Sequence, residues 1–172
     1  EKAPKDNLKQ LCAAVATTGM TNMFHFTPPS REMKIEKIDI EPKDLRRTKE
    51  ELSTASCTKP DLVFLGCPHC SVKEMKEIAR YFRGKKVKPG LEFWVCTSCY
   101  VKNKAKMTNE IIEESGGHVL TGVCTVVSWT EKLGIKTIMT NSAKTAYYAP
   151  TLSKAEAILA PAKECMNTAL EG

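Results

Sequence analysis

The sequence lacks the features that define membrane, secreted or fibrous proteins. No apolar run in its 172 residues approaches the roughly 20 residues that a transmembrane helix needs, so we predict no membrane span. The segment from Glu1 to Asp6 has no apolar core of a signal peptide, and we therefore expect a cytoplasmic protein. There is no repeat of fixed period and no low-complexity tract. A composition of 42% hydrophobic and 27% charged residues excludes a disordered or collagen-like chain.

A strong excess of one charge is also absent, whereas cysteine is abundant. The net charge of +6 comes from 26 basic and 20 acidic residues that are interspersed, so we expect no nucleic-acid partner. Eight cysteines are unusual for a chain of this length. Without a secretion signal, they indicate reduced thiols, a bound metal or a metal cluster rather than disulfides.

Residues 1–55 are predicted to form a helix–strand segment that packs on the domain formed by the rest of the chain. Apolar residues recur at helical spacing from Leu8 to Thr18, which predicts a helix. A short apolar run follows from Asn22 to Phe26. Alternating apolar and polar residues from Met33 to Ile40 predict a half-buried or edge strand. The segment from Pro42 to Leu52 is predicted to be a charged helix.

Residues 56–172 alternate apolar runs with amphipathic stretches. Runs of strand length lie at Asp61–Leu65, Leu91–Val95, His118–Val123, Lys136–Thr140 and Ala157–Leu159. Helices are predicted at Ser71–Phe82, Met107–Glu114 and Pro161–Leu170. This alternation is typical of a parallel sheet covered by helices on both faces. We therefore predict an α/β domain with three layers and a mostly parallel sheet.

Thiols follow three of the predicted strands. Cys67 and Cys70 come after the first strand, Cys96 and Cys99 after the second, and Cys124 after the third. Because ligands of such sheets bind beyond the carboxyl ends of the strands, we expect these groups to gather at one edge. Thiolates are soft ligands that suit zinc or an iron–sulfur cluster.

The residues alone leave alternatives open for these cysteines. Two C-x2-C pairs, Cys67/Cys70 and Cys96/Cys99, are compatible with a structural zinc site in a binding module without chemistry. However, the cysteines end apolar strands that have a core of their own, and Cys124 exceeds the four ligands of zinc, which favours a functional cluster. Any single thiol can also be a small buried apolar side chain. We favour this last interpretation for Cys12, Cys57 and Cys165.

The fourth predicted strand leads into a possible anion site, Asn141-Ser142-Ala143-Lys144. This segment opens a helix, so its backbone N–H groups point outward, and the ammonium group of Lys144 adds a positive charge. Ser142 can also be simply the N-cap of that helix, and the two roles are compatible.

Several motifs resemble those of the aconitase X family. They are the runs from Asp61 to His69, from Gly117 to Cys124 and from Met139 to Lys144, the last followed by Tyr147-Tyr148-Ala149-Pro150. Their order and spacing are similar to those of the family. Residues Leu11 to Phe26 also resemble a helix–strand segment of the family, so the resemblance covers nearly the whole chain. The large subunit of the family is longer, and we expect this chain to be its C-terminal part.

The resemblance implies an α/β fold, an iron–sulfur cluster, expected to be [4Fe-4S], and dehydration of a hydroxy acid. Carried over by motif, Cys67 and Cys124 are cluster ligands, and the third ligand is expected in an upstream region. Lys144, with Ser142 and Asn141, falls where the family contacts its anionic substrate.

Within the family, the chain is most similar to the branch that dehydrates (R)-5-phosphomevalonate to trans-anhydromevalonate 5-phosphate. Dehydration of another hydroxy acid, such as a hydroxyproline, is the alternative. The catalytic base of the family is a serine in a separate small subunit or a fused domain. The resemblance therefore implies a heterodimer, no catalytic residue in this chain, and little activity without the small subunit and the upstream region.

Overall fold

The computed structural model describes residues 3–19, 21, 23–25 and 36–170. At its centre is a five-stranded parallel sheet with the strand order β3-β2-β1-β4-β5. The strands are β1 (Leu62–Cys70), β2 (Glu92–Thr97), β3 (His118–Thr121), β4 (Thr137–Thr140) and β5 (Glu156–Leu159). The α-helices are α1 (Lys5–Gly19), α2 (Pro42–Leu52), α3 (Val72–Phe82), α4 (Cys99–Lys104), α5 (Lys106–Glu114), α6 (Ala143–Tyr148) and α7 (Ala162–Ala169). The 3-10 helices η1 (Thr125–Val127) and η2 (Thr130–Leu133) precede β4, and the π-helix η3 (Ala149–Ser153) follows α6.

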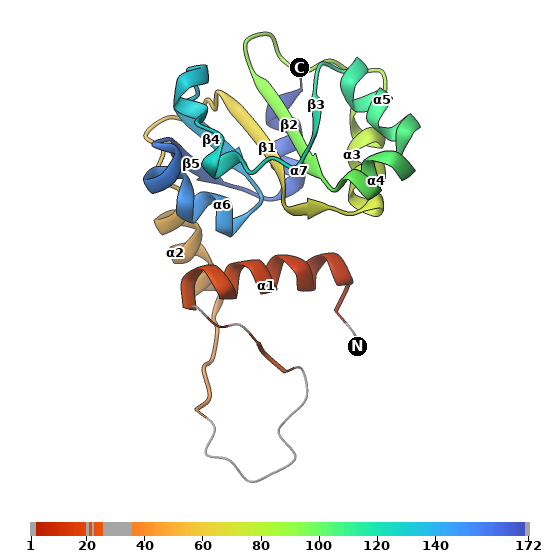
Figure 1. Cartoon of the computed structure of the whole chain (residues 1–172). Coiled ribbons are helices and arrows are strands. Elements are labelled where there is room, and N and C mark those ends of the chain that lie inside the picture. Colours follow the sequence, from red (N-terminus) through yellow and green to blue (C-terminus); the bar gives the residue numbers. More distant parts are fainter. Residues whose placement is uncertain (1–2, 20, 22, 26–35, 171–172) are drawn as a thin grey trace.

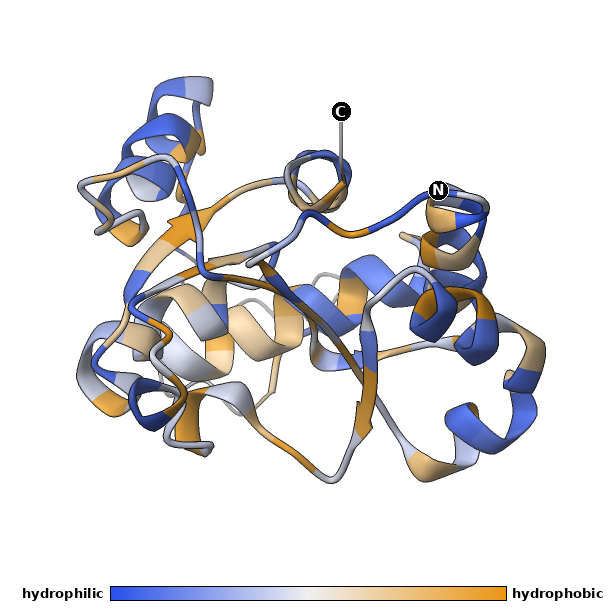
Figure 2. Ribbon diagram, turned by 90° about the horizontal axis from the view of Figure 1, so that it is seen from above, coloured by the Kyte–Doolittle hydropathy of each residue, from blue (hydrophilic) through white to orange (hydrophobic). Residues whose placement is uncertain are grey.

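Helices cover both faces of the sheet, which gives three layers (Figure 1). On one face, α3, α5 and α7 pack against β1 and β2, and the rings of Phe82 and Phe93 stack with 4.4 Å between their centroids. On the other face, α6 and η3 pack against β1 and β4. Figure 2 shows apolar residues on the central strands, while the polar sides of the helices lie outside.

This architecture confirms the predicted fold. Each of the five apolar runs overlaps a strand, and the helices predicted at 71–82, 107–114 and 161–170 agree with α3, α5 and α7 within one residue at each end. The reason is visible at β1, where Leu62 to Leu65 are all buried. A strand covered on both faces needs apolar side chains at every position, which produces a continuous run.

The prediction of a strand from Met33 to Ile40 is wrong for residues 36–40. Ile38 and Ile40 are 81% and 73% exposed, so the alternating side chains have no core or partner strand to cover them. Residues 33–35 lie outside the described ranges. Residues 22 and 26 of the apolar run at 22–26 lie outside them too, and 23–25 form no strand.

The N-terminal elements cover one end and one edge of the sheet. Helix α1 lies across the carboxyl ends of the strands (Figure 1) and contacts β1 and α6. After α2, the hydroxyl oxygens of Ser53 and Thr54 accept hydrogen bonds from the backbone N–H groups of Leu159 and Ala157, at 3.1 and 3.0 Å. These bonds occupy the edge of β5, which would otherwise be open to pairing with another strand. The division of the chain at residue 55 stays a prediction.

None of the helices in the described ranges has the length and apolarity to cross a bilayer.

The strand order reverses between β1 and β4. The chain runs outward from β1 to β2 and β3, and then returns to place β4 on the other side of β1. In open α/β sheets, ligands bind beyond the carboxyl ends of the strands at such a reversal. Cys67, near the end of β1, and Asn141, directly after β4, flank this point.

Candidate functional site

The end of β1 departs from regular strand pairing. Leu65 pairs with Val95 and Cys70 pairs with Thr97, so five residue steps on β1 correspond to two on β2. The additional residues bulge out of the ladder. The sequence predicts that the strand ends at Leu65. The structure instead continues β1 through the bulge to Cys70, where the hydroxyl group of Thr97 donates a hydrogen bond to the Cys70 carbonyl oxygen at 2.7 Å.

Gly66 allows this bulge to form. Its φ of +112° lies in a region that side-chain-bearing residues rarely adopt. A Cβ atom at this position would also lie 2.1 Å from the carbonyl oxygen of Cys96 on β2. The missing side chain therefore lets the segment before Cys67 lie directly against β2.

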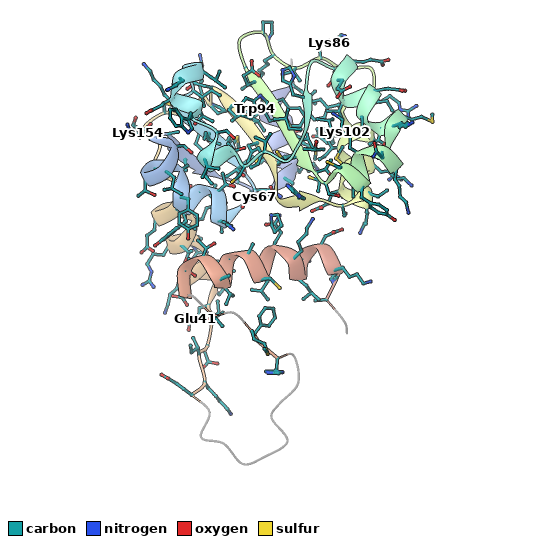
Figure 3. All side chains as sticks on the ribbon, in the orientation of Figure 1. Glu41, Cys67, Lys86, Trp94, Lys102 and Lys154 are labelled. Carbon is teal, nitrogen blue, oxygen red and sulfur yellow. The ribbon has the colours of Figure 1, made fainter. Side chains whose placement is uncertain are left out.

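Cys67 and Cys124 line one small pocket at the carboxyl end of the sheet, with a volume of about 70 Å³. Cys67 comes from the bulge of β1 and is half-buried, whereas Cys124 follows β3 by three residues and is exposed. Figure 3 labels Cys67 at the end of the sheet that faces α1. His69, Thr125 and Thr145 also contribute to the walls. The structure thus brings together the two thiols that the sequence predicts at one edge, while their role as ligands stays a prediction.

The thiol of Cys96 lies next to this pair. Cys96 is 1% exposed, and its S–H group donates a hydrogen bond to the carbonyl oxygen of Val123 at 3.6 Å. Burial, followed by the charges of the nearby Cys124 and Cys67 thiolates, raises the pKa of Cys96 to about 12. Within the described part of the chain, no three Cys, His, Asp or Glu side chains are grouped so that they could hold one metal ion.

The geometry disfavours the alternative zinc site. Cys70 packs in the core on one face of the sheet, and burial raises the pKa of its thiol well above the usual range. Cys96 is buried in the core on the other face, with Cys67 packed against it. Cys99 is exposed at the start of α4. Cys67 and Cys70 therefore lie on opposite faces of the sheet, and Cys96 is buried whereas Cys99 is at the surface. The members of each C-x2-C pair thus have different surroundings.

The prediction of buried apolar thiols is confirmed for Cys165 and wrong for Cys12 and Cys57. Cys165, on α7, is fully buried, and its S–H group donates a hydrogen bond to the carbonyl oxygen of Ala160 at 3.6 Å. Cys12 and Cys57 are both exposed. Cys12 is exposed because it lies on α1, a helix without buried residues.

The segment after β4 combines a helix cap with two polar side chains. Ser142 is the N-cap of α6, because its hydroxyl oxygen accepts the N–H group of Thr145 at 3.1 Å, and it is fully buried. The side-chain oxygen of Asn141 is buried and has no hydrogen-bond partner in the described part of the chain. Lys144 is half-buried, and no carboxylate among the described residues pairs with its ammonium group.

Thr125 and Thr145 belong to the pocket, although no sequence pattern identifies them. Both are 1% exposed, and their hydroxyl oxygens have no hydrogen-bond partner among the described residues. The only signal in the sequence is adjacency, since Thr125 follows Cys124 and Thr145 follows Lys144.

The chain is similar to several known proteins. Residues 60–171 match the aconitase X third domain. The chain is 39% identical to the phosphomevalonate dehydratase large subunit of Methanocaldococcus jannaschii, over 94% of this chain and 42% of that protein. It is 30% identical to the cis-3-hydroxy-L-proline dehydratase of Pseudomonas aeruginosa, over 97% of this chain and 31% of that enzyme.

A solved structure extends the similarity to three dimensions. The crystal structure of the holo-form of Thermococcus kodakaraensis aconitase X matches with a TM-score of 0.83 and 31% identity, over 98% of this chain and 45% of that chain. The chain therefore spans less than half the length of these relatives. The match over residues 60–171 includes the whole sheet and the pocket between β1, β3 and β4, and on this basis the chain belongs to the aconitase X family.

Proposed function

We propose that this chain is the C-terminal part of the large subunit of an iron–sulfur hydro-lyase that dehydrates (R)-5-phosphomevalonate to trans-anhydromevalonate 5-phosphate. The observation that carries the proposal is the meeting of Cys67 and Cys124 in one pocket at the reversal of the strand order. The relatives named phosphomevalonate dehydratase large subunit, at 39% identity in Methanocaldococcus jannaschii and 37% in Methanothermobacter thermautotrophicus, support this choice of substrate.

The pocket suits an iron–sulfur cluster in the chemistry of its groups. Thiolates are the usual ligands of iron in such clusters, and the pocket presents two thiols from different strand ends. Thr125 and Thr145, whose buried hydroxyl groups have no partner among the described residues, line the same space. We propose that Cys67 and Cys124 ligate a cluster, expected to be [4Fe-4S], and that the third ligand comes from an upstream region of the subunit.

When bound, the cluster would supply a Lewis-acidic iron for the hydroxyl group that leaves the substrate. We propose that the ammonium group of Lys144 binds the phosphate or carboxylate of the substrate and that the amide of Asn141 orients it. The hydroxyl group of Ser142 is fully buried and its backbone N–H group donates to the hydroxyl group of Thr140, so we propose that Ser142 serves this site by fixing the start of α6, which carries Lys144. Because α6 has only six residues, the charge of Lys144 contributes more than the helix dipole.

The remaining catalytic group is proposed to lie in a partner. Elimination of water also needs a base that removes a proton from the neighbouring carbon. We expect this base to be a serine of a small subunit, in agreement with the name large subunit carried by the relatives. The active enzyme would then be a cytoplasmic heterodimer of the mevalonate pathway.

The test is anaerobic reconstitution of the full-length large subunit with ferrous iron and sulfide, followed by a dehydration assay with the small subunit. We expect iron and acid-labile sulfide in the protein and activity with (R)-5-phosphomevalonate. Cys67→Ser and Cys124→Ser should each abolish cluster binding, whereas Cys12→Ser, at an exposed site outside the pocket, should not. One zinc per chain without sulfide would support the zinc-stabilised module instead.

A second substrate is worth testing in the same assay. The relative named cis-3-hydroxy-L-proline dehydratase covers 97% of this chain at 30% identity. Turnover of a hydroxyproline, without turnover of phosphomevalonate, would keep the hydro-lyase class and change the substrate.

A further inference from the structure

The wall of the pocket contains two threonines whose buried hydroxyl groups have no hydrogen-bond partner in the described part of the chain. Thr125, the first residue of η1, and Thr145, in the first turn of α6, are each 1% exposed and line the pocket with Cys67 and Cys124. A buried hydroxyl group without a partner is unfavourable, so native proteins rarely retain one. Its presence calls for an explanation, such as a ligand that accepts its hydrogen bond.

Such oxygen atoms gather around this site. In the described part of the chain, the buried side-chain atoms without partners belong to Asn109, Thr125, Thr130, Asn141 and Thr145. Thr125 and Thr145 line the pocket, and Asn141 directly follows β4 at the same edge of the sheet. The two threonines come from separate elements, so their convergence on one space does not follow from a shared turn or helix cap.

We propose that Thr125 and Thr145 are positioning residues whose hydroxyl groups donate hydrogen bonds to the sulfur atoms of the cluster and of its ligands Cys67 and Cys124. The inference rests on the proposed function, because it requires a cluster in this pocket. A threonine hydroxyl reaches a new acceptor by rotation about the Cα–Cβ bond, and in helices two rotamers of threonine are common. Hydrogen bonds to cluster sulfurs stabilise the reduced state and are among the factors that set the reduction potential.

The effect of the two threonines on stability should therefore differ between the protein without a cluster and the protein with one. Without the cluster, each buried hydroxyl group lacks a partner and destabilises the fold. With the cluster, each one has an acceptor and strengthens the site. Substitution by valine, which has nearly the same shape, should therefore stabilise the empty protein and weaken the loaded one. A purely structural role predicts no such opposition.

The experiment uses Thr125→Val, Thr145→Val and the double variant in the full-length large subunit, reconstituted anaerobically with ferrous iron and sulfide. We expect a chelator to remove iron at least about tenfold faster from the double variant, the usual scale for groups that support metal ligands. The reduction potential of its cluster should shift to more negative values. The melting temperature of the empty protein should stay equal or rise by about 2–4 °C.

Two controls make the result specific. Thr130→Val removes another fully buried hydroxyl group that has no partner among the described residues, but Thr130 does not line this pocket, so cluster lifetime and potential should stay at wild-type values. Thr125→Ser with Thr145→Ser keeps both donors and should restore wild-type lifetime and potential. Unchanged lifetime and potential in the double valine variant would overturn the inference and leave the proposed function standing. A wild-type subunit that takes up neither iron nor sulfide would overturn both.

Discussion

The ammonium group of Lys9 on α1 donates a hydrogen bond, at 2.8 Å, to the carbonyl oxygen of His69 in the bulge of β1. The same ammonium group pairs with the carboxylate of Glu74, which closes the capping box at the start of α3 together with Ser71. One side chain thus connects α1 to the strand end that carries Cys67. This connection matters because α1 has no buried residue of its own.

Lys9→Ala should therefore loosen α1 from the end of the sheet. The lysine and glutamate side chains are 23% and 22% exposed, so the lost charge-assisted bonds should cost about 1–2 kcal/mol of stability. Hydrogen exchange of the backbone amides of α1 should accelerate, while the amides of β1 and β2 keep their protection. Lys73→Ala, which removes a 72% exposed lysine, is the control and should change neither quantity. Equal protection of α1 in wild type and Lys9→Ala would contradict this role.

Gly66→Ala should prevent the bulge from forming correctly. The new Cβ atom would lie 2.1 Å from the backbone oxygen of Cys96, which cannot move without disrupting β2. We expect a loss of at least about 3 kcal/mol in the free energy of unfolding, which urea denaturation measures.

Gly84→Ala is a matched control for backbone strain. Gly84 also has a positive φ, of +72°, but apart from its two chain neighbours no described residue has an atom within 4 Å of the position of its Cβ atom. Its substitution should cost only about 1–2 kcal/mol, the strain of a left-handed residue. Similar losses in both variants would show that the contact with β2 is not the decisive factor.

The sequence predicted the sheet well because burial determines the residue pattern. Leu62 to Leu65 are buried on both faces of the sheet, and burial of this kind leaves a run that is visible without coordinates. The bulge at Gly66 was not predictable in the same way, since it depends on the distance to Cys96 on a strand 30 residues later. The buried state of Thr125 and Thr145 depends likewise on long-range packing, and their residue type is common in exposed loops.

Local helical spacing also had a clear limit. Cys12 fits the apolar face of a helix, and the helix exists, yet Cys12 is exposed and no residue of α1 is buried. A periodic pattern predicts which residues share a face. Whether that face is covered depends on what lies opposite it in the assembled protein.

Cys165→Ala should make stability less sensitive to alkaline pH. Burial, followed by the charge of Glu164, raises the pKa of Cys165 from 9.0 to about 12. The folded state therefore retains the thiol proton more strongly than the unfolded state, and this contribution to stability is complete below pH 9 and is lost as pH rises toward 12. The stability of wild type should fall above pH 9, with about 1.4 kcal/mol per pH unit from this thiol.

In the alanine variant, the cavity should cost about 1 kcal/mol at pH 7.5, and the decline above pH 9 should be shallower by the contribution of one thiol. Urea denaturation under reducing conditions between pH 7.5 and 10.5 measures both effects. Cys57→Ala, at an exposed site, should leave the decline unchanged. Parallel curves for wild type and Cys165→Ala would show that this thiol does not titrate as its burial requires.

In the proposed enzyme, Lys144→Ala should weaken substrate binding and leave the absorption spectrum of the proposed cluster unchanged. Lys144 is half-buried, it lies on the first turn of α6, and no carboxylate in the described part of the chain pairs with it. A positive charge at a helix start is slightly unfavourable, so a bound anion gives a physical reason for its position. Loss of the contact should cost about 2–3 kcal/mol, seen as a rise in the Kd of the phosphorylated substrate of roughly 30- to 150-fold.

Lys163→Ala, at an exposed position on α7, should bind substrate like wild type. Wild-type affinity in Lys144→Ala, or loss of the cluster, would place the anion site elsewhere.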